Sequence, residues 1–423
     1  MVLAVSLLVG FALLVGVAYL FFGLAVICDE FLAPLERLAE ALRIPTHVAA
    51  VTLVAFGSSA PELAISVVGA TTNNTEASIP TVLASALIAF GLIPALVVLA
   101  VGGPVTLQFQ PLVRDTCAYL VGLVLLIYVY FNRSGSINMA DALGLVAVYV
   151  VYLAIVWTPW TRPFQDGDAA EPLLNATVLD VTVVRSPAPA PDESDVSAEK
   201  ADEAGKADEV RPAKDGAEFS CSDFVGLLRR PWSVVFRATV RGGPVPAFFV
   251  TLAWIGLTSW AAMYLTTLVA NCFYITAATA GLTLLAFGAQ IPDLIAAIEL
   301  ARNGLADSGI AQALGSQVIN VTLGLGLPFA IYTAASGKNT DNENSSVIQE
   351  IGYILIFLIA IVFASLLPTL KRGEACLANV GECCGADRRR LPTFSVTLTP
   401  FHSKIFCVLF ALAYAGCIFV AEY

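Results

Sequence analysis

Two carboxylates in strongly apolar sequence are the side chains best placed to do chemistry. Glu62 stands in the run AFGSSAPEL (residues 55–63), Asp293 stands in AFGAQIPDL (residues 286–294), and each directly follows a proline. An ionised carboxylate in the middle of a membrane costs about 2.5–3.5 kcal/mol on insertion scales. No Lys or Arg lies within the apolar stretches near either acid, so a structural ion pair does not explain them. We expect a divalent cation between the two carboxylates.

The two acids occupy equivalent positions of an internal repeat. Residues 52–85 align without a gap with residues 283–316, and this alignment pairs Glu62 with Asp293. Duplicated halves, with a substrate site near the bilayer midplane where the halves meet, are typical of secondary transporters. The repeat therefore predicts a membrane transporter built from two related halves.

Backbone carbonyls and neutral side chains near the acids add further oxygen atoms. Because proline has no N–H, the carbonyls of Gly57 and Gly288, four residues before each proline, lose their helical partner. We expect an unwound turn with free carbonyls at both glycines. Polar side chains recur at helical spacing, namely Ser58, Ser59 and Ser66 beside Glu62, Ser85 in the next span, and Gln312, Ser316 and Asn320 in the second repeat. Carboxylates and carbonyls suit hard cations, and Ca²⁺ takes six to eight oxygens.

Composition indicates an all-α membrane protein that crosses the bilayer many times. Of 423 residues, 58% are hydrophobic and only 13% are charged, which does not suit a set of soluble domains. A helical span needs about 20 apolar residues. Ten candidate transmembrane helices cover residues 3–28, 46–70, 78–101, 113–131, 139–158, 245–269, 273–301, 308–335, 349–370 and 403–421. Much of the net charge of −11 lies in one central segment, and nothing points to nucleic acid.

The spans divide into two transmembrane halves of opposite orientation. The first half is 1–160, with its repeat at about 46–101, and the second is 245–423, with its repeat at about 273–335. Because each half holds five spans, the two five-helix repeats are inverted relative to one another. Lys and Arg concentrate in the central segment and on one side of the spans. The positive-inside rule predicts that this side is cytoplasmic and that both termini are outside or luminal, in the plasma membrane or an endomembrane.

Residues 161–244, between the halves, differ from the rest of the chain. A Pro-Ala tract leads into sequence rich in Asp, Glu, Ala and Lys, so about 185–218 is predicted to be a disordered cytoplasmic linker. Residues 219–241 mix Trp, Phe and Leu with four arginines. That pattern favours a helix on the membrane surface, with a plain basic flank of the sixth span as the alternative.

Both repeats resemble a known family at the residues around the acids. The first repeat carries GSSAPEL (57–63) and TVLASA (81–86), and the second carries PDL (292–294) and GSQVIN (315–320). In these motifs the chain resembles the calcium/cation antiporter superfamily and its sodium/calcium exchanger branch, with the potassium-dependent exchangers closest. The resemblance implies an inverted five-plus-five helix fold, exchange of Ca²⁺ for Na⁺ by alternating access, and a transporter rather than an enzyme, without a resident cofactor.

The resemblance also implies roles for individual residues. Glu62 and Asp293 match the family's central calcium-binding acids, and four serines match its positions that bind sodium and calcium. Together with the carbonyls and amides of both repeats, the expected cation ligands are Glu62, Asp293, Ser58, Ser59, Ser85, Ser316, Asn320, Gln290, Gly57 and Gly288. The expected partners are inorganic cations and the lipid bilayer, and the sequence leaves the oligomeric state open.

Three departures from the family pattern leave the counter-ion open. Ala289 and Gln290 stand where the second repeat usually has Thr and Ser. Ala89 replaces a usual Asn, and Asn320 stands where potassium-dependent members tend to carry Asp. We therefore keep a proton-coupled exchanger, a carrier of Mg²⁺ or Zn²⁺, and a cation-binding protein without transport as alternatives. An intramembrane aspartyl protease needs two carboxyls that share a proton, and it is disfavoured because the usual Gly-x-Gly-Asp signature is missing.

Overall fold

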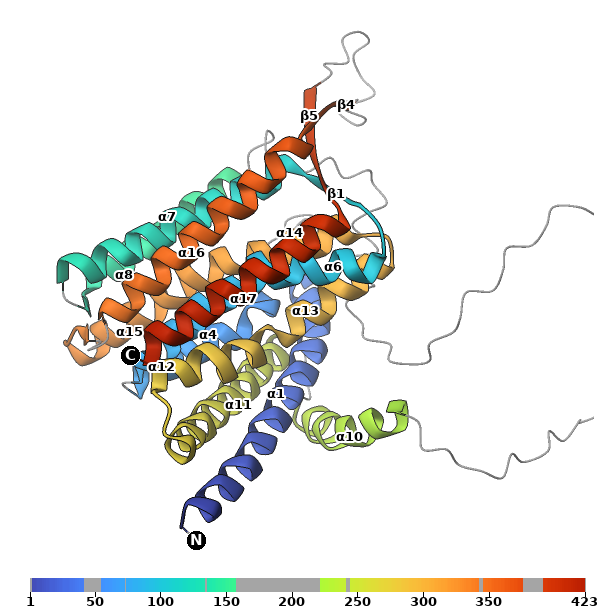
Figure 1. Ribbon diagram of the computed structural model, residues 1–423. Helices are drawn as coiled ribbons and strands as arrows, with labels where there is room; N and C mark the ends of the chain where they lie inside the picture. Colours follow the sequence, from blue (N-terminus) through green and yellow to red (C-terminus); the bar gives the residue numbers. More distant parts are fainter. Residues whose placement is uncertain are drawn as a thin grey trace, which may run out of the picture.

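Nearly all of the described part of the protein is helical. The computed structural model describes residues 2–41, 55–72, 74–133, 135–156, 221–240, 244–341, 345–375 and 391–422. Its long helices lie side by side in one bundle (Figure 1). The stretch predicted to be disordered, about 185–218, lies outside these ranges.

Nine helical stretches of the described chain are long and apolar enough to cross a membrane. They are Ser6–Cys28, Thr75–Val101, Phe109–Arg133, Met139–Val156, Val245–Phe273, Ala277–Arg302, Ala306–Ser336, Ser345–Thr369 and Pro400–Glu422. Each lies within a few residues of a predicted span. The remaining prediction, 46–70, is only partly described, and it contains α4 (Ala60–Thr71), a shorter apolar helix. The protein is an integral membrane protein with many spans, and the total of ten stays a prediction.

Several spans are made of more than one helical segment. The first half contains α1 (Val2–Ala41), α3 (Ala55–Ser58), α4, α5 (Thr75–Leu87), η2 (Ile88–Leu92), α6 (Ile93–Val101), α7 (Phe109–Arg133) and α8 (Met139–Val156). The rest contains α10 (Cys221–Thr239), α11 (Pro244–Phe273), α12 (Ala277–Ala280), η4 (Gly281–Leu285), α13 (Ala286–Arg302), α14 (Ala306–Ile319), η5 (Asn320–Gly324), α15 (Leu325–Ser336), α16 (Ser345–Leu366), the short η6 (Leu367–Thr369) and α17 (Pro400–Glu422).

Short π-helical turns occur at related places in the two repeats. The π-helices η2 and η5 lie within one residue of equivalent positions in the alignment that pairs Glu62 with Asp293. A third π-helix, η4, directly precedes α13. Such wide turns interrupt the regular hydrogen-bond ladder and often mark functional sites. In this protein η2 and η4 adjoin segments that carry predicted ligands, and η5 itself contains one, Asn320.

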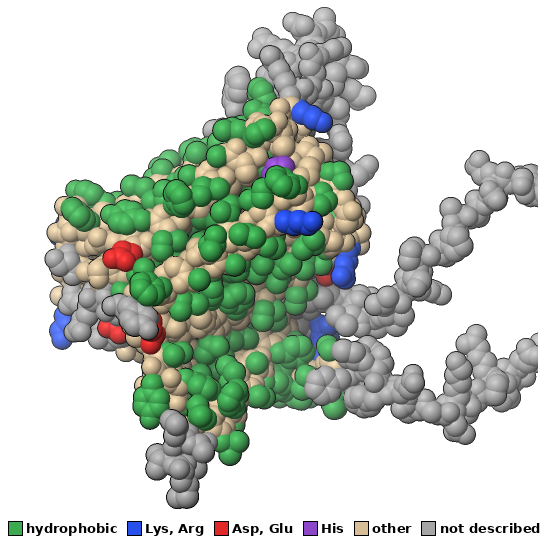
Figure 2. Space-filling model, in the orientation of Figure 1, with side chains coloured by type: hydrophobic (Ala, Val, Ile, Leu, Met, Phe, Trp, Pro, Cys, Tyr) green, Lys and Arg blue, Asp and Glu red, His purple; other side chains and the backbone are tan. Residues whose placement is uncertain are grey.

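Exposed apolar side chains cover the outside of the bundle. Leu8, Phe131 and Phe249 are 72%, 70% and 63% exposed. Figure 2 shows a largely hydrophobic middle, with Lys and Arg mostly toward one end of the helices and Asp and Glu toward the other. A large apolar surface of this kind suits contact with lipid. The span formed by α5, η2 and α6 is instead mostly buried, so it lies inside the bundle.

Two small antiparallel sheets join the two halves, which the all-helical prediction missed. Strand β5 (Leu391–Leu398) lies between β1 (Val105–Gln108) and β4 (Lys371–Ala375), with Val105 opposite Leu398. A second pair consists of β2 (Ser136–Ile137) and β3 (Thr340–Asp341). Strands β1, β2 and β3 are too short to carry a periodic signal, and the partners of all three lie about 200 residues or more away in sequence. Each sheet ties a connection of the first half to a connection of the second.

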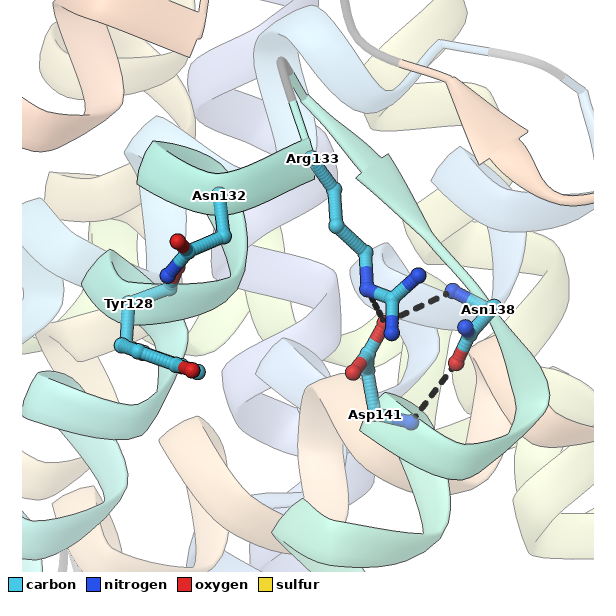
Figure 3. Close-up of polar contacts among 5 residues, drawn as sticks. All are labelled: Tyr128, Asn132, Arg133, Asn138 and Asp141. Carbon is cyan, nitrogen blue, oxygen red and sulfur yellow. Dashed lines mark hydrogen bonds and ion pairs between the residues drawn. The ribbon is translucent and has the colours of Figure 1, made fainter.

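A compact turn between α7 and α8 holds β2 in place (Figure 3). The Asp141 N–H donates to the side-chain oxygen of Asn138 (2.9 Å), and the Asn138 N–H donates in return to the Asp141 carboxylate (3.3 Å). This reciprocal arrangement caps the start of α8. Arg133, at the end of α7, pairs with the same carboxylate (2.9 Å). The turn therefore presents β2 in a fixed position for pairing with β3.

Helix α10 packs against α1, which in turn packs along α11. Trp232 of α10 lies over Gly23, where any side chain would collide with the indole ring. Its ring also contacts Tyr19 of α1, with 5.6 Å between the ring centroids. A helix thus occupies most of the predicted range 219–241, and its place on a membrane surface stays a prediction.

Candidate cation site

The two acids lie buried near one another, on helices from different halves. Glu62 is in the first turn of α4 and 1% exposed, and Asp293 is within α13 and 2% exposed. The two carboxylates are close enough to interact electrostatically. Gln290, one turn before Asp293, donates a hydrogen bond from its Nε2 to Glu62 Oε1 (2.8 Å). A single turn of α13 thus connects the two carboxylates.

Serines from both repeats gather around Asp293. Ser316 of α14 donates its hydroxyl to Asp293 Oδ2 (2.9 Å). The side chain of Ser58, at the end of α3, also interacts with this carboxylate. Ser59 donates its hydroxyl to the backbone carbonyl of Ser316 (3.3 Å). Of the serines predicted from the first repeat, Ser58 therefore reaches the acid of the second, whereas Ser59 contacts the backbone of its neighbour Ser316.

Gln317 lies at the centre of this network, although the sequence interpretation did not select it. Its Oε1 accepts from the Ser85 hydroxyl (2.9 Å) and from Asn320 Nδ2 (3.4 Å). Its Nε2 donates to Ser316 Oγ (3.1 Å). Face periodicity passed over Gln317 because adjacent residues point about 100° apart on a helix. A buried amide needs hydrogen-bond partners, and Gln317, like Asn320, carries a buried amide.

Five buried oxygen atoms near the acids have no hydrogen-bond partner among the described residues. They are Glu62 Oε2, Asp293 Oδ1, Gln290 Oε1, Asn320 Oδ1 and Ser66 Oγ. Buried polar atoms are almost always paired, because leaving one unpaired costs roughly 1–3 kcal/mol. Carboxylate, amide and hydroxyl oxygens are the ligands that Ca²⁺ and other hard cations take. This set of oxygen ligands therefore fits a hard cation as the transported substrate.

The charge of the two acids is not balanced by protein cations in the described part of the chain. The ion pairs found there join Arg114 to Asp115 and Arg133 to Asp141, and neither includes Glu62 or Asp293. The described part of the chain also contains no cluster of three or more His, Cys, Asp and Glu side chains that could hold a metal ion. A cation at this site would thus meet two carboxylates and neutral oxygens, a combination that favours hard cations over softer metals.

The first repeat is interrupted close to where an unwound turn was expected. Helix α3 ends at Ser58, α4 begins at Ala60, and Ser59 forms a turn between them. The interruption therefore lies two residues after Gly57, which is itself buried within α3. The break in the helix was expected at Gly57, and the structure has it at Ser59.

The expectation of an unwound turn at Gly288 is wrong. Helix α13 runs without a break from Ala286 to Arg302 and contains both Gly288 and Pro292. Packing by neighbouring helices holds a membrane helix together when a proline removes one hydrogen bond. The ring of Phe21 in α1 lies where a side chain at Gly288 would be. This glycine therefore permits close contact between α1 and α13.

A buried pair of acids between two halves of a multi-pass helical bundle is the arrangement of a membrane ion transporter. The chain belongs to the sodium/calcium exchanger protein family, whose sequence model matches residues 12–158 and 244–420. These segments cover most of both predicted halves. Membership places the chain among membrane cation exchangers rather than among enzymes.

Individual relatives are similar over much of their length. The chain is 25% identical to human sodium/potassium/calcium exchanger 5 over 416 residues, which covers 90% of this chain and 82% of that protein. It is 24% identical to the probable sodium/potassium/calcium exchanger CG1090 of Drosophila melanogaster over 434 residues, covering 75% of this chain and 68% of the relative.

Solved structures of exchangers also match, at lower identity. The crystal structure of the H⁺/Ca²⁺ exchanger CAX matches with a TM-score of 0.48 and 13% identity, over 98% of this chain and 85% of that chain. A structure of the sodium-calcium exchanger NCX_Mj matches with a TM-score of 0.45 and 15% identity, over 95% of this chain and 99% of that chain.

Proposed function

We propose that this protein exchanges Ca²⁺ for Na⁺ across a membrane by alternating access, with Glu62 and Asp293 holding the ions. The observation that carries the proposal is the connected pair of buried acids, each with one oxygen that has no partner in the part of the chain that the structure describes. Two carboxylates match the charge of one Ca²⁺, which reduces the penalty of burying ions in a low-dielectric site. The family and the named relatives support calcium as the divalent ion.

The neutral side chains have distinct parts in this proposal. Ser58, Ser316 and Asn320 supply oxygens, and Gln317 orients Ser316 by donating to its hydroxyl oxygen. The Ser316 hydroxyl lies 2.9 Å from both Asp293 Oδ2 and the backbone carbonyl of Ala313, and we assign its hydrogen to Asp293 Oδ2. Asp293 Oδ1 then stays available to the ion. Na⁺ ions use the same oxygens when Ca²⁺ has left, so the two ions compete.

Alternating access follows from the place of the site between the halves. Inverted repeats allow one half to move against the other and expose a central site to either side in turn. The polar network crosses from one half to the other, and it includes the turn at Ser59 and the start of η5 at Asn320. We place the linker and the β1–β5–β4 sheet in the cytoplasm and both termini outside or in a lumen, because of the distribution of Lys and Arg.

Proton coupling is the second candidate, favoured by a specific observation. Ala289 contributes no side-chain oxygen, and the Gln290 amide donates to Glu62 rather than presenting a hydroxyl. The site therefore offers few neutral ligands for several Na⁺ ions, whereas protons could neutralise the carboxylates directly. Transport of Mg²⁺ or Zn²⁺ is tested in the same way, by replacing Ca²⁺.

Flux measurements in proteoliposomes test these proposals. The purified full-length protein is reconstituted, and ⁴⁵Ca²⁺ uptake is followed while Na⁺, K⁺ and H⁺ gradients are imposed one at a time. We expect an outward Na⁺ gradient to drive uptake. If a proton gradient alone drives uptake, the counter-ion is H⁺ and not Na⁺. Calcium binding without flux under any gradient would instead identify a cation-binding protein that does not transport.

A further inference from the structure

Gln290 and Ser59 are aligned in the repeat, yet they make different contacts across the two halves. The Ser59 hydroxyl donates to a backbone carbonyl, that of Ser316. The longer Gln290 side chain reaches the carboxylate of Glu62. The inverted repeat is therefore asymmetric at this point, and Glu62 receives a donor at an atom that a cation would otherwise contact.

The chemistry of Glu62 fixes the orientation of the Gln290 amide. The amide presents its NH₂ group to Glu62 Oε1, and an ionised carboxylate only accepts hydrogen bonds. The amide Oε1 is then directed elsewhere, and this buried atom meets no hydrogen-bond partner within the described ranges. The N–H donor partly compensates the charge on Glu62 Oε1, while Glu62 Oε2 has no partner among the described residues.

The two acids thus have donors of different kinds. Asp293 accepts from the hydroxyl of Ser316, and a hydroxyl oxygen retains lone pairs that can contact a cation. The nitrogen that faces Glu62 has no lone pair to offer. A cation can use Glu62 Oε1 fully only after the Gln290 amide turns away.

We propose that Gln290 is a built-in donor that replaces one monovalent counter-ion at Glu62. Fewer monovalent ions then exchange for each Ca²⁺ than a hydroxyl at this position would require. When Ca²⁺ arrives, the amide rotates and offers Oε1 as a ligand. One side chain is therefore a donor in one state of the cycle and an oxygen ligand in the other. This inference rests on the proposed exchange function and adds to it the origin of the ion stoichiometry.

Equilibrium competition in the purified full-length protein tests the inference without relying on transport. Calcium binding is measured by titration calorimetry at a series of Na⁺ concentrations, with choline keeping the ionic strength constant. The variants are Gln290→Ser, whose hydroxyl is too short to reach Glu62, and Gln290→Met, which keeps the volume but removes the donor. Gln349→Ser is a matched control, since Gln349 lies in α16 outside the polar network.

The expected result is a steeper competition by the monovalent cation in both Gln290 variants. The slope of log apparent Kd against log cation concentration gives the number of monovalent cations displaced by each Ca²⁺. This slope should rise by about one, because an uncompensated buried carboxylate needs another positive charge. The Gln349→Ser slope should equal that of the unmodified protein. In the absence of monovalent cations, Gln290→Met should bind Ca²⁺ more weakly, since it has lost the Oε1 ligand.

The competition slopes of the Gln290 variants either support or overturn the inference. Equal or lower slopes in the Gln290 variants overturn the inference, and if Gln290→Ser does not fold, Gln290→Met decides alone. The titration is repeated against K⁺ and against pH, so that the result does not depend on which cation is carried. Failure of every ion gradient to drive flux in proteoliposomes would refute the exchange function, and this result is separate from the equilibrium slopes.

Discussion

The hydroxyl of Ser85 on α5 donates to Oε1 of Gln317 on α14 (2.9 Å), which joins the two repeats through neutral side chains. Gln317 continues the chain of donors, because its Nε2 donates to Ser316 Oγ (3.1 Å) and Ser316 donates to Asp293 (2.9 Å). Gln317 thus sets the direction of a ligand without contacting either carboxylate.

Replacing Gln317 should weaken cation binding without removing the site. Gln317→Leu keeps the approximate volume but no longer orients Ser316. Loss of a partner that supports a ligand typically lowers metal affinity about 10–100-fold. Titration calorimetry with Ca²⁺ provides the measurement, and Gln349→Leu in α16 is the control. An unchanged affinity in Gln317→Leu would contradict the positioning role.

Neutralising either acid should abolish divalent transport while the protein still reaches the membrane. Glu62→Gln and Asp293→Asn preserve size and hydrogen bonding but remove half of the negative charge that faces the ion. The measurement is ⁴⁵Ca²⁺ uptake in proteoliposomes, with the amount of protein determined in the same vesicles. Glu76→Gln, in the first turn of α5, is the control. Retained uptake in either acid variant would count against the shared site.

Transport should require little or no K⁺, although the similar proteins are named sodium/potassium/calcium exchangers. A monovalent ion beside Ca²⁺ needs extra negative charge to offset repulsion between the cations. Asn320 offers an oxygen that no described residue hydrogen-bonds, but it carries no charge. Calcium uptake at a fixed Na⁺ gradient is compared with external K⁺ present or replaced by choline. A several-fold drop without K⁺ would refute this prediction, and Asn320→Asp is the substitution expected to introduce a K⁺ requirement.

A side chain at Gly288 should destabilise the fold through α1. Gly288→Ala places a methyl group against the Phe21 ring, and overpacking of this kind costs about 1–3 kcal/mol. Thermal unfolding in detergent should show a lower Tm, which Phe21→Ala should partly restore in the double variant. Gly256→Ala is the control, since nothing lies within 4 Å of the added atom. An unchanged Tm for Gly288→Ala would show that α1 and α13 are less tightly packed.

Deleting about 186–215 should leave basal transport intact. The acidic composition of this stretch predicts a tether that supplies no ligands to a site inside the membrane. Uptake by the deletion variant is compared with that of the full chain at equal protein per vesicle. Loss of uptake by a correctly inserted variant would show that the linker takes part in transport.

Sequence reasoning located the acids and most of their surroundings because the chemistry is unusual for its setting. A carboxylate in apolar sequence, repeated at Glu62 and Asp293, indicates a site regardless of the detailed fold. The span limits also follow from composition, since apolar length is a strong signal. Hydroxyls near the acids were found from helical spacing, and the structure places Ser58 and Ser316 beside Asp293.

Features that depend on tertiary contacts could not be found in this way. The role of Gly288 depends on Phe21, a residue of a different span, and the continuity of α13 depends on its neighbours. Gln317 needs Ser85 and Ser316 beside it before its role is visible. In both small sheets a strand of the first half pairs with a strand of the second, β1 with β5 and β2 with β3, so no local pattern reveals these pairings.

The pairing of Val105 with Leu398 has a consequence for synthesis of the protein. Strand β1 leaves the ribosome early, whereas β5 is made close to the end of the described chain. At about 5–20 residues per second, β1 waits on the order of 15–60 s for its partner. During this time it presents a strand edge that could pair with other nascent chains. Its length of only four residues limits that hazard, and the sheet cannot close before β5 has been made.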